Sequence, residues 1–124
     1  MGKRSRRRAT QDGGRPDKLA APTSDYTNAK GNVLTLRGAL TAATRREYAE
    51  ALAGNPLSRE DAWQRAVELL FERLTARWTI AGAPLEGQRE LLQRYRAASP
   101  DERFWIRDVL REHCSEHFPE LRAP

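Results

Sequence analysis

The large apolar residues in the middle of the chain recur at helical spacing. From residue 58 to about Ile80, the intervals between them are four, three, one, three and four residues. The residues are Trp63, Val67, Leu70, Phe71, Leu74 and Trp78. A stripe of this kind is typical of a helix that buries one face along its length. The sequence therefore predicts that this segment is the main core helix.

Two shorter segments on either side of it also have helical patterns. Thr44-Arg45-Arg46-Glu47 has the form of a capping box, and Tyr48 and Leu52 follow at helical spacing. These residues predict a helix that begins at Thr41 or Thr44. Apolar positions between residues 85 and 98 predict another.

Ser99-Pro100-Asp101-Glu102 is the clearest helix start in the chain. It combines an N-cap serine, a proline at the first helical position and an acid that can reach back to the cap. We expect a fourth helix from here to about His117, where Pro119 ends it. Residues 33–36 alternate between apolar and polar, and we interpret them as a short extended arm. The predicted fold class is all-α: a compact, four-helix-bundle-like domain over residues 34–121.

The charge is divided unequally along the 124 residues. Residues 1–31 hold eight Lys or Arg and three Asp, a net charge of +5, whereas residues 32–124 hold fourteen of each sign. The first 33 residues contain almost nothing to bury, so we predict a disordered basic tail over residues 1–33. Its cations are concentrated in Lys3, Arg4, Arg6, Arg7 and Arg8.

A cluster of cations of this kind binds the nucleic-acid backbone without reading its sequence, because it displaces condensed counterions. We therefore expect nonspecific nucleic-acid binding through the tail. The alternative is that the tail only keeps the protein in solution.

The last predicted helix carries two rows of like charge. Arg103, Arg107 and Arg111 recur every four residues beside Phe104, and Asp108, Glu112 and Glu116 form a parallel acidic row. Like charges four residues apart destabilise a helix slightly, by about 0.2–0.5 kcal/mol per pair. The arginine row is thus a secondary candidate for contacts with phosphates or with an acidic protein surface. The alternative is a solvated face in which the rows pair with each other, as Asp108 can with Arg111.

His113 and His117 are four residues apart, a spacing that can bring two imidazoles to one metal. Cys114 lies where the zinc-protease helix motif requires a glutamate, and no third ligand can be identified, so we predict no metal site and no cofactor. Histidines near a helix end are also explained by the helix dipole. Cys114, the single cysteine, is interpreted as a small core residue.

The segment from Leu40 to Leu52 resembles the first helix of the core-binding domain of tyrosine recombinases, where a Thr, Tyr and Leu pattern opens a helical DNA clamp. Without the Arg, His and Tyr set of the recombinase catalytic domain, this resemblance implies no activity, and we assign no family from it.

No nucleotide-binding or hydrolase motif occurs, and paired acids stand at helix starts, where capping explains them. No apolar run is long enough to span a bilayer. We therefore predict a small non-catalytic, nucleic-acid-associated protein in the cytoplasm, whose helical domain binds a protein partner or itself. The alternative is a protein-binding adaptor or regulatory subunit whose tail only solubilises.

Overall fold

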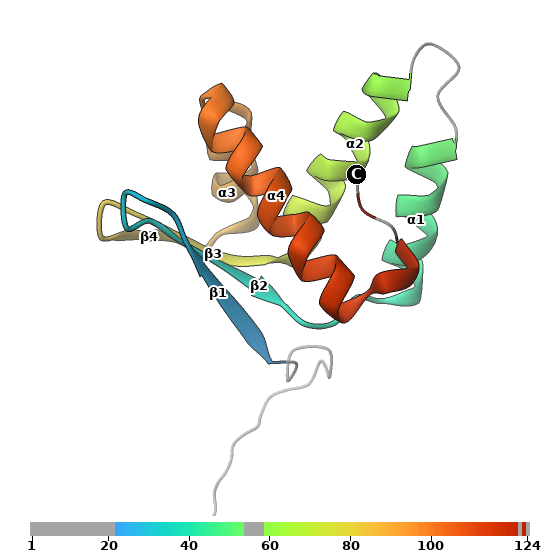
Figure 1. The fold of residues 1–124 in the computed structure, drawn as a ribbon, viewed down its shortest axis with the longest axis horizontal. Coiled ribbons are helices and arrows are strands. Elements are labelled where there is room, and N and C mark those ends of the chain that lie inside the picture. The colour runs from blue at the N-terminus through green and yellow to red at the C-terminus, as the bar shows by residue number, and fades with distance from the viewer. Residues whose placement is uncertain (1–21, 54–58, 122, 124) are drawn as a thin grey trace, which may run out of the picture.

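The computed structural model describes residues 22–53, 59–121 and 123, and it has a mixed α/β fold (Figure 1). Four strands form one antiparallel sheet in the order β1-β2-β3-β4, and the helices lie to one side of it. The strands are β1 (Thr23–Thr27), β2 (Val33–Arg37), β3 (Thr75–Ile80) and β4 (Ala83–Leu85). The helices are α1 (Ala42–Ala53), α2 (Arg59–Leu74), α3 (Gln88–Arg96) and α4 (Pro100–His117), with a short 3-10 turn, η2 (Pro119–Leu121). The prediction of an all-α four-helix bundle is therefore wrong.

The predicted core helix ends at Leu74, six residues earlier than expected, and the chain continues directly into β3. Trp78 fits both structures: it extends the helical stripe by one turn, and in the strand it points inward opposite Leu34. Spacing alone could not separate these alternatives. The β-branched residues of β3 (Thr75, Thr79 and Ile80) favour a strand, and they decide the outcome together with pairing to β2.

Strand β2 is central and pairs with β1 on one side and with β3 on the other. Leu34 and Leu36 are fully buried, and Leu34 lies between Tyr26 of β1 and Trp78 of β3. The expected extended arm is therefore part of a sheet. The sequence does not reveal its partners, because β3 has the apolar spacing of a helix and β1 lies within the predicted tail of residues 1–33. Residues 23–33 belong to the folded region.

The tight turn between β3 and β4 has two residues, Ala81 and Gly82, both with positive φ (51° and 81°). Such turns match the twist of the flanking strands and favour Asn-Gly. The side-chain oxygen of Asn32 accepts a hydrogen bond from the Ala81 N–H at 3.0 Å, which ties this turn to the β1–β2 hairpin. Ala81 adopts a left-handed conformation that alanine disfavours.

The substitution Ala81→Asn is expected to raise the free energy of unfolding by about 0.5–1 kcal/mol, because asparagine tolerates the left-handed conformation. Urea denaturation measures the change. Ala83→Asn, in the strand just after the turn, is the matched control and should give no gain. A loss of stability at position 81 would contradict the turn.

The core lies between the inner face of the sheet and helices α2, α3 and α4. Its fully buried large side chains include Leu34, Leu36, Trp78, Leu70, Phe71, Leu74, Ile106 and Leu110. On the opposite face of the sheet, the Thr35 hydroxyl donates to Asp25 at 2.6 Å. None of the helices in the described ranges covers that face (Figure 1).

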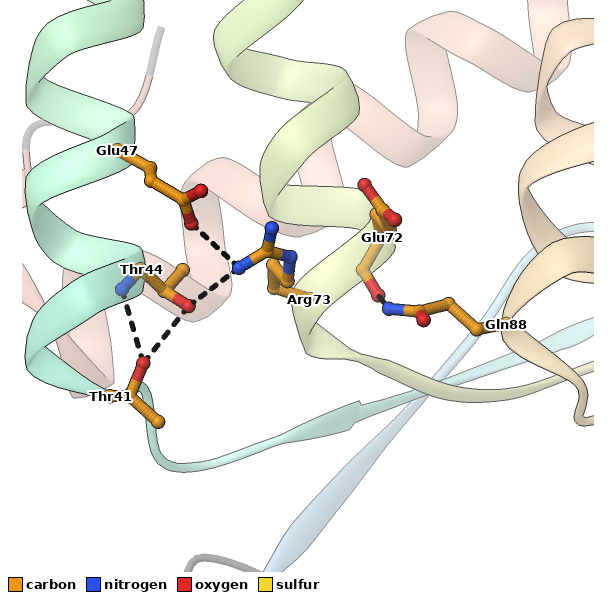
Figure 2. A network of polar contacts seen from close by, with 6 residues as sticks. All are labelled: Thr41, Thr44, Glu47, Glu72, Arg73 and Gln88. Atoms are coloured by element: carbon orange, nitrogen blue, oxygen red, sulfur yellow. Dashed lines mark hydrogen bonds and ion pairs between the residues drawn. The ribbon is translucent and has the colours of Figure 1, made fainter.

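A polar network fixes α1 against α2 (Figure 2). The Thr41 hydroxyl accepts from the Thr44 N–H at 3.1 Å, so Thr41 rather than Thr44 caps α1. The Arg73 guanidinium of α2 donates to the Thr44 hydroxyl at 3.0 Å and to the Glu47 carboxylate at 2.7 Å. Glu47 therefore binds the neighbouring helix and does not close the predicted capping box.

Helix α4 begins and ends where the sequence predicts. The Ser99 hydroxyl accepts from the Glu102 N–H, the Glu102 carboxylate accepts from the Ser99 N–H, and Pro100 occupies the first turn. Helix α3 is shorter than the predicted 85–98, because residues 83–85 form β4. Of the helices in the described ranges, none is both long and apolar enough to cross a membrane.

Candidate partner-binding groove between α2 and α4

A groove of about 370 Å³ lies between the N-terminal halves of α2 and α4. Val67 and Tyr95, which are 5% and 7% exposed, are the most buried of the residues that line it. Arg103, Phe104 and Arg107 line it from α4. Two of the three arginines predicted on α4 therefore share one concave surface with the aromatic residue that stands beside them in the sequence.

The corner between α3 and α4 places these residues. The capping box at Ser99 starts α4 immediately after α3, and Arg94 of α3 bonds the Glu102 carboxylate at 2.6 Å. The Arg94 guanidinium and the Ser99 bonds lower the pKa of Glu102 below its usual value. Arg94 also lies over the Trp78 ring, 5.0 Å from its centroid, which ties the corner to the sheet.

Arg103 and Arg107 lie over aromatic rings, and neither pairs with a carboxylate in the described part of the chain. Arg103 lies over Tyr95 at 5.3 Å and donates to the Arg96 carbonyl at 2.7 Å. Arg107 lies over Trp63 at 5.7 Å, and its Nε is buried with no hydrogen-bond partner among the described residues. Cation–π contacts leave the outer N–H groups of a guanidinium able to bond a partner.

Arg111 differs from the other two members of the row. It pairs with Asp108 at 3.1 Å, the i,i+3 contact that the sequence suggested, and it does not line the groove. Exposed pairs of this kind contribute little to stability, typically below about 1 kcal/mol. The predicted row is thus not one continuous cationic surface.

Phe104 is 67% exposed and is the one exposed large hydrophobic residue in the part of the chain that the structure describes. A single exposed hydrophobic side chain is common on protein surfaces. Phe104 differs from such a side chain because it lines a groove together with two arginines that have no carboxylate partner among the described residues.

The α2 wall of the groove is acidic, and sequence reasoning did not identify it as part of a site. Glu60, Asp61 and Glu68 line it together with Arg65. Arg65 pairs with Asp61 at 3.3 Å, and Glu68 pairs with Arg96 at 2.9 Å. Glu60 and Asp61 lie in the first turn of α2, which is the role that the sequence predicts for them. They also line the groove with α4, and this depends on how the two helices pack, which no sequence signal indicates.

His113 is a structural residue with both ring nitrogens bonded. Its Nε2 donates to the Arg37 carbonyl at 2.8 Å, and its Nδ1 accepts from the Tyr26 hydroxyl at 2.8 Å. His117 lies close by, with 4.5 Å between the ring centroids. A metal at His113 would have to displace one of these bonds, and the described residues contain no group of three potential ligands around it.

Cys114 is buried, and burial raises the pKa of its thiol to about 11. A thiol with such a pKa is protonated at neutral pH and is a poor nucleophile. The geometry agrees with its interpretation as a core residue.

The five cations of the N-terminal cluster, Lys3, Arg4, Arg6, Arg7 and Arg8, lie outside the described residues.

Comparison of the chain with protein-family models, with curated proteins and with solved structures finds no match.

Proposed function

We propose that the protein is a small, non-catalytic, nucleic-acid-associated protein of the cytoplasm, in which the N-terminal cations bind phosphates and the folded domain carries a groove for a protein partner. The observation that carries this proposal is the division of charge, with +5 in the first 31 residues and balanced charge in the remainder.

Ion pairs within the fold support this division. Seven arginines of the described residues pair with carboxylates: Arg45, Arg65, Arg73, Arg77, Arg94, Arg96 and Arg111. A paired arginine offers little net attraction to a polyanion. The acidic α2 wall also opposes the entry of a phosphate chain into the groove between α2 and α4. The N-terminal cluster is therefore the main candidate for phosphate contacts, and Arg103, Arg107 and Arg111 are secondary.

Binding of a short labelled DNA, followed by fluorescence anisotropy as salt is varied, tests the proposal. The full chain should show a slope of about −4 to −5 in log K against log salt if five phosphates are contacted. Replacing Lys3, Arg4, Arg6, Arg7 and Arg8 with glutamine should reduce affinity at low salt at least about tenfold and remove most of the slope.

The matched control replaces the three secondary candidates, Arg103, Arg107 and Arg111, with glutamine, and it should retain most of the slope. Equal binding by the full chain and by the five-residue variant would contradict the proposal. Binding that salt does not weaken would contradict it as well.

The groove itself favours a protein over a nucleic acid as its occupant. It combines an exposed phenylalanine with charges of both signs, as protein interfaces do. This observation supports the adaptor function as a second candidate, in which the folded domain alone is sufficient for binding.

A further inference from the structure

The two walls of the groove carry opposite net charges. On α2, the side chains of three acids (Glu60, Asp61 and Glu68) and one arginine (Arg65) sum to −2, and Arg96 of α3 offsets one of these charges at Glu68. On α4, Arg103 and Arg107 give +2. The groove is thus divided along its length into an acidic side and a basic side.

Among the described residues, the charges of the α4 wall do not pair with those of the α2 wall. Arg103 and Arg107 form no ion pair with a carboxylate in the part of the chain that the structure describes, and their guanidinium groups lie over Tyr95 and Trp63 instead. Glu60 is exposed and accepts a hydrogen bond only from the amide of Gln64 among the described residues, at 3.2 Å. Cations and anions on opposite sides of the groove remain able to bind a second molecule.

A second copy of the same groove has the required charge pattern. When two copies meet face to face about a two-fold axis that runs along the groove, the acidic wall of each lies against the basic wall of the other. The same rotation carries each Phe104 across the axis to the α2 side of the opposite groove. The exposed ring would there cover the apolar surface around Val67.

We propose that the groove between α2 and α4 is a self-association surface, in which two copies of this chain pair Arg103 and Arg107 of one with the acidic wall of the other and bury both Phe104 rings. Stable interfaces usually bury about 800 Å² on each partner. The groove is smaller than such an interface, so the dimer is weak and reversible. Salt weakens it because its charge pairs lie near solvent.

Sedimentation of the full chain over a wide concentration range tests this inference. At low salt the average mass should rise with concentration toward twice that of one chain. Phe104→Ala should weaken association at least about tenfold, and because the ring is 67% exposed the variant should remain folded.

Two charge-reversal variants give the sharper test. One combines Arg103→Glu with Arg107→Glu, and the other combines Glu60→Arg with Gln64→Arg, which changes the α2 wall from −2 to +1. Each variant alone should stay monomeric, because like charges then face each other across the axis. An equimolar mixture should recover a heterodimer, a result that two misfolded variants could not produce.

The matched control combines Arg89→Glu with Arg111→Glu, which changes the net charge equally away from the groove and should leave association unchanged. A full chain that stays monomeric at every concentration would overturn the inference. So would groove variants that associate like the full chain, or a mixture that does not pair. Loss of DNA binding in Phe104→Ala without any self-association of the full chain would assign the groove to a nucleic acid instead.

Discussion

Replacing Phe71 with alanine is expected to lower the free energy of unfolding by about 3–5 kcal/mol. Phe71 is fully buried on α2. Its ring stacks on Tyr95 with 4.7 Å between centroids and meets Trp78 edge-on at 5.9 Å. The substitution would leave a cavity where α2, α3 and β3 meet, and it would remove both aromatic contacts. Because small domains are stable by only about 5–15 kcal/mol, the variant should be close to unfolding.

Phe104→Ala provides the matched control, since it deletes the same side chain from an exposed position. Its effect on the free energy of unfolding should lie within about 0.5 kcal/mol of zero. Urea denaturation followed by tryptophan fluorescence measures both variants. Similar losses for the two would contradict the burial of Phe71 and the exposure of Phe104.

The second large effect is a loss of stability in mild acid, which His113 should cause. Burial lowers the pKa of His113 below its usual value, and nearby His117 adds to this. The Arg37 carbonyl and Glu116 act in the opposite direction but do not cancel the shift. In the folded protein the ring is neutral, with Nε2 donating to Arg37 and Nδ1 accepting from Tyr26. Protonation would turn Nδ1 into a donor facing the Tyr26 hydroxyl.

The sign of the effect follows from the unfolded state, where a histidine has a pKa of about 6.5. Below that pH the unfolded chain binds a proton that the folded chain excludes, so the free energy of unfolding falls as the pH falls. One such group reduces stability by at most about 1.4 kcal/mol per pH unit, until the pH reaches the folded pKa. Stability should be constant with respect to this group above about pH 7.5.

Urea denaturation at several pH values from about 7.5 to 5.5 measures this dependence. His113→Gln should lose most of it, because glutamine does not titrate, at the cost of about 1–2 kcal/mol from one imperfect hydrogen bond. His117→Gln keeps the buried ring and should keep most of the dependence, because burial is the largest cause of the lowered pKa of His113. An unchanged pH profile in His113→Gln would show that another group is responsible.

The parts of the fold that could be predicted from the sequence have signals that lie within a few residues. Helix α4 was placed correctly because Ser99, Pro100 and Glu102 form its first turn by themselves. The start of α1 was less certain, since Thr41 and Thr44 are both possible caps and Glu47 fits a capping box that the fold does not use. A local motif is reliable only where no distant residue competes for the same side chain.

The sheet could not be predicted in this way, because each strand depends on a partner that is distant or weakly marked. Strand β1 has the sequence Thr-Ser-Asp-Tyr-Thr, in which only Tyr26 is a large apolar residue, so its pattern resembles a polar tail. What holds it is pairing with β2 and the bond from Tyr26 to His113, 87 positions away. Strand β3 has an apolar spacing that a helix would share.

The sequence predicts the arginine row beside Phe104 on α4, but it does not predict a groove. Arg103, Arg107 and Phe104 share one face of α4, and helical periodicity brings them together in any fold. Their acidic counterpart on α2 depends on how the two helices pack. Arg111 belongs to the same periodic row, yet Asp108 neutralises it locally. Periodicity identifies the residues of one wall, and tertiary structure supplies the other.

The central pairing of the sheet has a consequence for how the domain holds together. Strands β2 and β3 are adjacent in space, but both α1 and α2 lie between them along the chain (Figure 1). The β1–β2 and β3–β4 hairpins close through short turns, and an isolated hairpin is at best marginally stable in water. The two hairpins can therefore join only while the α1–α2 pair spans the gap, and those helices in turn need the joined sheet to cover their apolar faces. Neither layer can be excised as a smaller folding unit, since the sheet and its helices must melt and form as one cooperative block.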